Sequence, residues 1–145
     1  MSSTQRKARA KRLAGTEEIV EEQHHEELIT GIAEQLKPIL DGSPQAVYVY
    51  LDDIHKLCNK RFADLLGYAS ARAWAKVDAP LADVVDEDQE AVVSAYRNAS
   101  ERLIASQLKV RVKNIKDKTV TKTDMIIVPI AYRDHVFVLH FLSRS

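Results

Sequence analysis

Residues 59–68, Asn-Lys-Arg-Phe-Ala-Asp-Leu-Leu-Gly-Tyr, predict a short helix with both ends marked in the sequence. Asn59 belongs to the residue types that cap helix N-termini, and Gly67 suits the left-handed position that often follows a helix. Three apolar residues fall on one side of this helix: Phe62, Leu65 and Leu66. The segment is therefore expected to be a small internal helix that packs on a core.

A hairpin precedes this helix and further helices follow it. Ala46 to Leu51 is rich in Val and Tyr, and Asp52-Asp53 predicts a tight connection to a short return strand, His55 to Cys58. After the helix, Ser70 to Lys76 predicts one or two helical turns that carry Trp74, ended before Pro80. A longer helix is expected to open at Asp86 or Asp88, with Val92, Tyr96, Ala99 and Leu103 at helical spacing.

The C-terminal third predicts three strands, Gln107 to Asn114, Thr119 to Tyr132 and Val136 to Leu142, joined by two polar turns. The first strand alternates apolar and charged residues, which predicts one wet face. Met125 to Ile130 and Val136 to Leu142 are apolar on both faces. Because an antiparallel sheet usually leaves one face to water, a further element should cover the outer face here.

The N-terminal segment supplies a candidate for that cover. Residues 1–15 carry five basic side chains and almost no large apolar ones, which predicts a flexible basic arm. Residues 16–39 predict an amphipathic helix that Thr16 can cap, with an apolar seam formed by Ile29, Ile32, Leu36 and Ile39. We expect this helix, from the same chain or from a partner, to pack over the outer face of a compact domain spanning residues 40–145.

The order of these elements resembles the PAS domain family over Leu40 to Phe141. Residues 59–68 match that family's Asn-x-x-Phe-x-x-Leu-x-Gly-Tyr signature, whereas Lys118 stands where the family usually has glycine in a Lys-Asp-Gly turn. The resemblance implies an α+β fold with a five-stranded antiparallel sheet and flanking helices that enclose a ligand pocket. It also implies that the outer sheet face serves dimerisation or signal transmission.

This fold assigns candidate residues to two sites. The expected ligand-pocket residues are Val49, Asn59, Phe62, Trp74, Tyr96, Val110, Val128 and His140. For Trp74 and Tyr96, filling of the core is favoured over contact with a ligand. The expected dimer-interface residues are Ile29, Ile32, Leu36, Ile39, Ile127, Phe137 and Phe141.

No cofactor is identified by the sequence. The flavin-binding PAS subgroup has a reactive Cys in the motif Asn-Cys-Arg-Phe-Leu-Gln, but here the order is Cys58-Asn59, so a flavin adduct is disfavoured. Haem is also disfavoured. The haem-sensing PAS subgroup typically ligates iron with a His on the long internal helix, and residues Asp88 to Leu103 contain none. Adjacent His24 and His25 point about 100° apart on a helix and cannot share one metal ion, so we predict no metal site. We expect Cys58 to be a small buried apolar side chain, with a redox sensor as the alternative.

Composition narrows the class of protein. The 21 basic and 21 acidic residues cancel, which argues against nucleic acid as a partner. Four scattered glycines offer no phosphate-binding loop, and no nucleophile motif is present, so we do not expect an enzyme. We expect the protein to lie in the cytoplasm, because the sequence has a lone cysteine and shows neither a signal peptide nor an apolar run long enough to span a membrane.

The sequence thus predicts a stand-alone PAS-like sensory module that dimerises and acts by protein contact, with a small molecule as a candidate ligand in its core. No kinase or DNA-binding segment fits in the remaining length. We therefore expect either a separate signalling protein as the partner or a larger system of which this chain is the sensory piece. The alternative is an enzyme with a cone-shaped fold, similar to nuclear-transport-factor or ketosteroid-isomerase proteins, in which Tyr96 and His140 act with a carboxylate. A third option is nucleic-acid contact by the basic arm.

Overall fold

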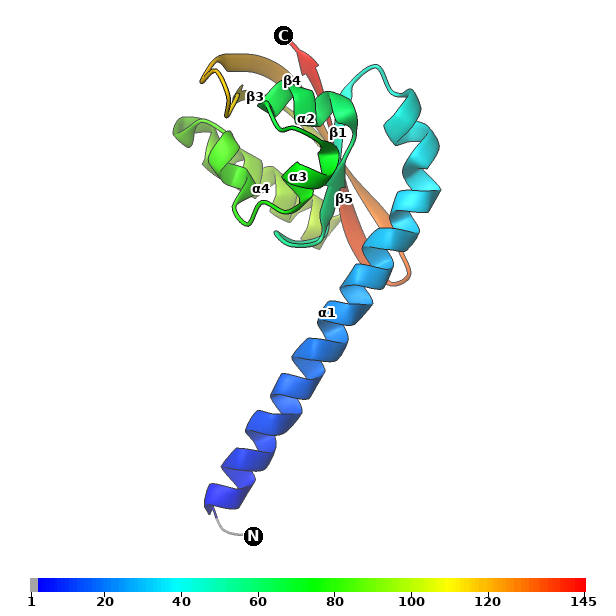
Figure 1. Cartoon of the computed structure of the whole chain (residues 1–145), viewed down its shortest axis with the longest axis vertical. Helices are drawn as coiled ribbons and strands as arrows, with labels where there is room; N and C mark the ends of the chain where they lie inside the picture. Colours follow the sequence, from blue (N-terminus) through cyan, green and yellow to red (C-terminus); the bar gives the residue numbers. More distant parts are fainter. Residues whose placement is uncertain (1–2) are drawn as a thin grey trace.

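Figure 1 shows a computed structural model of the chain, which describes the backbone of residues 3–145 and the side chains of residues 23–145. A long helix, α1 (Ser3–Gly42), precedes a sheet of five strands: β1 (Ala46–Tyr50), β2 (Lys56–Cys58), β3 (Ser106–Lys113), β4 (Val120–Tyr132) and β5 (His135–Arg144). Four helical segments separate β2 from β3: α2 (Lys60–Leu66), α3 (Ala71–Ala75), the 3-10 helix η1 (Pro80–Asp83) and α4 (Asp86–Arg102). The predicted order of elements and the α+β class are confirmed.

The strands form one antiparallel sheet in the order β2-β1-β5-β4-β3. The N-terminal hairpin joins the C-terminal strands through β1 and β5, in a register that places Tyr48 opposite His140 and Val49 opposite Leu139. The internal helices lie against one face of the sheet, and the second half of α1 lies against the other (Figure 1). We call these the inner and the outer face.

Residues 59–68 fold as predicted. Asn59 caps α2 by accepting a hydrogen bond from the Phe62 amide at 3.0 Å, and Gly67 ends the helix with a φ of 80°. The Asn59 carboxamide also accepts from the Val47 amide at 3.0 Å and donates to the Gln45 carbonyl at 2.9 Å. One side chain therefore joins the start of α2 to the start of β1.

The outer face is covered by α1 of the same chain. Leu28, Ile32 and Leu36 are buried on it and pack with four residues of the two central strands: Val47, Val49, Phe137 and Leu139. Burial of each large aliphatic side chain stabilises such a contact by about 1.5–3 kcal/mol. The predicted cover is confirmed, and within the described chain it is provided in cis.

Two boundaries of α1 differ from the expectation. The helix continues past Pro38 to Gly42, although proline removes one backbone hydrogen bond, because Leu36 and Leu40 still pack on the outer face on either side of it. It also runs through residues 3–15, where we expected a flexible arm. The side chains of residues 3–22 lie outside the described set, so a role for the basic arm stays a prediction.

Smaller details of the domain follow backbone geometry. Lys118 adopts a φ of 64°, so it occupies the left-handed turn position where glycine would be less strained. Leu103 does not continue the apolar stripe of α4. It adopts a φ of 58° as the residue that ends the helix, and it is 61% exposed. Among the residues that the structure describes, no helix has both the length and the apolar character needed to cross a bilayer.

Two isoleucines of the predicted seam provide a test of how α1 is docked. Ile32 is 1% exposed and Ile39 is 40% exposed. We expect Ile32→Ala to lower the free energy of unfolding by about 2–5 kcal/mol, since it leaves a cavity between α1 and the sheet. The matched change Ile39→Ala should cost about 0.5 kcal/mol. Urea denaturation of both variants measures the difference, and equal losses would show that α1 does not pack as described.

Candidate ligand pocket

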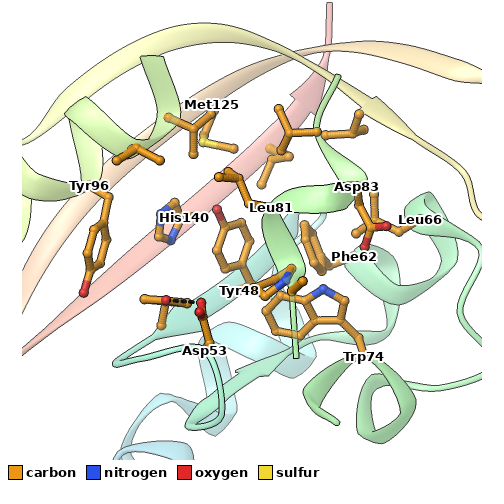
Figure 2. A pocket seen from close by; sticks show the side chains of 18 of the residues that line it. Tyr48, Asp53, Phe62, Leu66, Trp74, Leu81, Asp83, Tyr96, Met125 and His140 are labelled. Carbon is orange, nitrogen blue, oxygen red and sulfur yellow. Dashed lines mark hydrogen bonds between the residues drawn. The ribbon is translucent and has the colours of Figure 1, made fainter. Parts of the chain in front are cut away.

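A cavity of about 430 Å³ lies between the inner face of the sheet and the internal helices. Figure 2 shows its lining, in which the sheet contributes Tyr48, Met125 and His140 and the helices contribute Phe62, Trp74 and Tyr96. Most of the lining is aliphatic or aromatic. The volume lies within the range of about 300–1,000 Å³ that is common for small-molecule sites.

Stacked aromatic rings form one wall of the cavity. The Tyr48 ring lies 3.9 Å from the His140 ring at an interplanar angle of 9°, so the two cross-strand neighbours stack face to face. Phe62 and Trp74 approach Tyr48 with ring centroids at 4.7 and 5.4 Å. Burial raises the pKa of Tyr48, so its hydroxyl is protonated and the wall carries no charge there.

The indole of Trp74 lacks a hydrogen bond. Its Nε1 atom is buried and has no hydrogen-bond partner among the described residues. A buried polar group without a partner costs about 1–3 kcal/mol. Trp74 therefore contributes its ring to the lining while its polar atom is left unsatisfied.

A buried lysine holds Trp74 in place. Lys56 is 4% exposed, and its ammonium group lies 5.3 Å from the centre of the Trp74 ring. The ammonium group donates to the carbonyl oxygens of Asp53, Ala75 and Val77. Burial lowers the pKa of Lys56, although nearby Asp53 opposes that effect. This network fixes the end of α3 on the β1–β2 hairpin.

Several other polar side chains of the lining form hydrogen bonds within the protein. Tyr50 donates to the Asp53 carboxylate, and the Tyr96 hydroxyl donates to the Leu51 carbonyl at 3.3 Å. At the opposite end of the cavity Asp83 accepts from the Tyr68 hydroxyl at 2.6 Å. Burial raises the pKa of Asp83, while the bond from Tyr68 and nearby Lys113 act against it.

His140 is neutral in the folded domain. Burial lowers its pKa to about 3, and its Nδ1 atom lies 3.1 Å from the Val138 carbonyl, which can only accept. Its low pKa makes it a weak base, and its neutral ring, stacked on Tyr48, forms part of the wall.

Four of the eight predicted pocket residues line the cavity: Phe62, Trp74, Tyr96 and His140. The other four do not. Val49 and Val128 point to the outer face, because side chains alternate along a strand and Tyr48 occupies the inner position beside Val49. Asn59 is used as the cap of α2, and Val110 is buried in the inner core away from the cavity.

The predicted interface residues gather on the outer side, with two exceptions. Ile29, Ile32, Leu36, Phe137 and Phe141 all belong to the contact between α1 and the outer face. Ile127 does not. It lies opposite His140 on the inner face and is fully buried in the inner core. Its assignment to an interface was therefore wrong, because the side chains that point outward are those of the adjacent positions in β4. Ile39 is 40% exposed on α1.

No family model and no curated protein sequence matches this chain. Solved structures do match it. A PAS domain of a Colwellia psychrerythraea protein has a TM-score of 0.61 and 22% identity, over 79% of this chain and 97% of that one. The chain has the PAS fold.

Two further solved structures support this conclusion. The PAS domain of an HTR-like protein from Haloarcula marismortui has a TM-score of 0.60 and 14% identity, over 85% of this chain and 99% of that one. A PAS domain from a two-component sensor histidine kinase has a TM-score of 0.57 and 15% identity, over 80% of this chain and 99% of that one. The cone-shaped alternative does not fit this PAS fold, in which a hairpin precedes the internal helices and pairs with the last strand.

The buried state of His140 predicts how stability depends on pH. The unfolded chain binds a proton at His140 near pH 6.5, whereas the folded domain resists protonation until about pH 3. The unfolded state therefore binds more protons between these values, and the free energy of unfolding should fall as the pH drops through this window, by at most about 1.4 kcal/mol per pH unit. Urea denaturation from pH 7 to pH 4 measures this slope.

His140→Phe is the matched control, because phenylalanine keeps an aromatic ring beside Tyr48 and cannot titrate. The slope of the variant should be smaller than that of the unmodified domain by the His140 contribution, while carboxylates and other histidines contribute equally to both. Identical slopes would mean that His140 is not buried in its neutral form.

Proposed function

We propose that this PAS domain is a sensory module, not an enzyme, which binds a small, mostly apolar molecule in the cavity and transmits its occupancy through α1. The observation that carries the proposal is the placement of β1 and β5. On their inner face Tyr48 and His140 line the cavity, and on their outer face Val49 and Leu139 contact α1. Any change in cavity shape that moves these strands also moves the surface on which α1 rests.

The chemistry of the cavity supports binding more than catalysis. Two of its titratable groups, Tyr48 and His140, are held neutral by burial, and Tyr50 and Asp53 are paired with each other. Cys58 is buried outside the lining, and burial raises the pKa of its thiol to about 12, so it stays protonated. A protonated, buried thiol is a poor nucleophile, which supports a non-covalent ligand and disfavours a flavin adduct.

Dimerisation through α1 and the outer face is the second part of the proposal. The helix extends well beyond the sheet on its N-terminal side (Figure 1). Near its C-terminal end Ile39 is 40% exposed, and on the outer face of β4 Ile126 is also 40% exposed. Two copies that pair along α1 could transmit a change in helix orientation to each other or to a separate signalling protein. In this reading the protein acts in the cytoplasm, as its single buried cysteine suggests.

Trp74 is the single tryptophan of the chain and lines the cavity, so it reports on binding. Native mass spectrometry of protein purified from cells should reveal a retained small molecule as a fixed mass difference. After its removal, the apolar fluorophore 1-anilinonaphthalene-8-sulfonate should bind in the cavity and accept energy from Trp74, which we expect to see as saturable quenching of tryptophan emission.

Two neighbouring residues of α4 allow a matched control for that binding. Val93 lines the cavity, whereas Ser94 is exposed and does not. Val93→Phe should fill part of the cavity and weaken fluorophore binding about tenfold or more, and Ser94→Phe should leave the affinity unchanged. Equal affinities in the two variants would place the fluorophore outside the cavity and remove the support for an internal ligand.

The dimer is tested by light scattering coupled to size exclusion. Residues 23–145 contain every described contact of α1 with the sheet, so removal of residues 1–22 should leave the domain folded. We expect the full chain to be a dimer and the shortened chain to be a monomer or a weaker dimer. A full chain that is monomeric at tens of micromolar would contradict dimerisation.

A further inference from the structure

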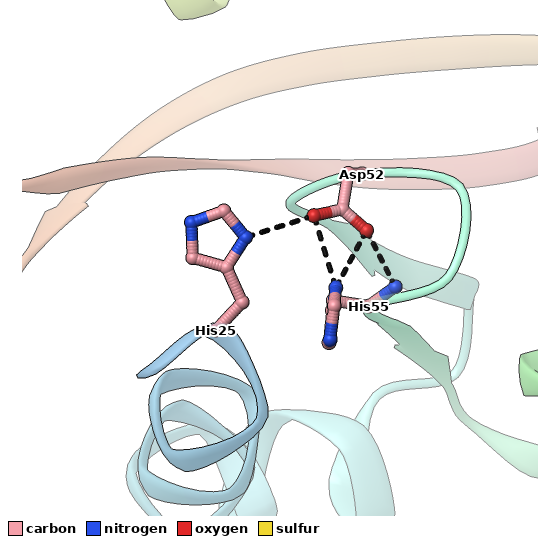
Figure 3. A group of neighbouring side chains, drawn as sticks. All are labelled: His25, Asp52 and His55. Atoms are coloured by element: carbon pink, nitrogen blue, oxygen red, sulfur yellow. Dashed lines mark hydrogen bonds and ion pairs between the residues drawn. The ribbon is translucent and has the colours of Figure 1, made fainter. Parts of the chain in front are cut away.

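Four of the five histidines of the chain gather at one place, away from the ligand cavity. His24 and His25 belong to α1, His55 closes the turn between β1 and β2, and His135 begins β5. The ring of His25 lies 5.5 Å from that of His55 and 5.4 Å from that of His135, and the ring of His24 lies 5.1 Å from that of His135. Asp52 lies among them (Figure 3).

Two of these histidines, His25 and His55, point a ring nitrogen at the Asp52 carboxylate. The His25 Nδ1 atom is 3.0 Å from Asp52 Oδ2, and the His55 Nδ1 atom is 2.8 Å from Asp52 Oδ1 (Figure 3). One ligand atom from each of the three lies within 4.8 Å of the others. Metal–ligand bonds of about 2.0–2.2 Å in a tetrahedral zinc site place ligand atoms about 3.3 Å apart. Small rotations of these side chains therefore suffice to surround one ion.

Two of the ligands are held in position before any ion binds. The Asp52 carboxylate accepts from the backbone amides of Ile54 at 3.1 Å and His55 at 2.8 Å, and the His55 amide also bonds the Asp52 carbonyl. These bonds fix the turn, so Asp52 and His55 face the same way. The side chain of His55 is 6% exposed, and that of Asp52 is 37% exposed.

The third ligand is positioned by the packing of α1. His25 stands three residues before Leu28, which is fully buried on the outer face, and its own side chain is 18% exposed. In this position the His25 Nδ1 atom reaches the Asp52 carboxylate from a different element of the fold.

We propose that His25, Asp52 and His55 form a binding site for a divalent transition-metal ion of the Zn²⁺ class, which fastens α1 to the β1–β2 turn. Imidazole nitrogens suit Zn²⁺, Ni²⁺ and Cu²⁺, whereas Mg²⁺ prefers a shell of oxygen ligands. Three protein ligands leave a coordination position that water or His135 can occupy. The ion would lie close to the point at which α1 leaves the domain in Figure 1, so its binding would favour the docked helix.

Calorimetric titration of the untagged, EDTA-treated full chain with ZnCl₂ tests the site. We expect one Zn²⁺ per chain and no measurable heat with MgCl₂. Removal of a ligand in His25→Ala or Asp52→Asn should weaken the affinity about 100-fold or more, because loss of even an outer-shell partner costs about 10–100-fold. His24→Ala, at the exposed neighbour of His25, is the matched control and should change the affinity less than threefold.

Circular dichroism and urea denaturation without metal separate loss of the site from loss of the fold. Asp52→Asn keeps the shape of the side chain and serves where His25→Ala fails to fold. Absence of Zn²⁺ binding in the full chain, or full affinity in both His25→Ala and Asp52→Asn, would overturn the proposal. In that case the three side chains form only a hydrogen-bonded group.

Hydrogen exchange tests the effect on α1. Saturating Zn²⁺ should slow amide exchange in residues 25–36 of the full chain at least fivefold, and also in His24→Ala, but not in His25→Ala. Unchanged exchange in the zinc-bound chain would contradict the fastening of α1 even if the ion binds. None of these measurements involves the ligand cavity, so their outcome does not depend on the proposed sensory function.

Discussion

The antiparallel pairing of β1 with β5 is the constraint on which the rest of the structure depends. It brings residues 46–50 beside residues 138–142, nearly the whole length of the domain apart in sequence. Both strands are apolar on two faces, so the cavity and the internal helices can occupy one side while α1 occupies the other. If this pairing were lost, the ligand wall, the helix-docking surface and the link between them would be lost together.

The features that the sequence predicted are those that depend on residues close together in the chain. The cap and the end of α2 are set by Asn59 and Gly67, and the order of strands and helices follows from local patterns of apolar residues and turns. It was harder to predict which side chains of β1 and β4 face the inner side of the sheet. Both strands are apolar on both faces, so no alternation separated Tyr48 from Val49 or Ile127 from its neighbours, and an error of one residue moved each to the wrong face.

Contacts between distant segments explain what the sequence did not show. The Asp52-x-x-His55 spacing is local, but His25 approaches it only because α1 crosses the outer face with Leu28 beneath it. His24 and His25 still cannot bind one ion as an adjacent pair, but His25 lies beside Asp52 and His55 from other elements. Lys56 was missed for a similar reason, since its carbonyl acceptors come from α3 and the segment that follows it.

The three hydrogen bonds of Asn59 limit what evolution could place at that position. Serine, threonine and aspartate also cap helices well, yet the hydroxyls are too short to reach two amides and a carbonyl at once. Aspartate would set a negative charge against the Gln45 carbonyl, which needs a donor. A residue chosen only to start a helix would have many substitutes, whereas one that also ties the helix to the first strand has almost none.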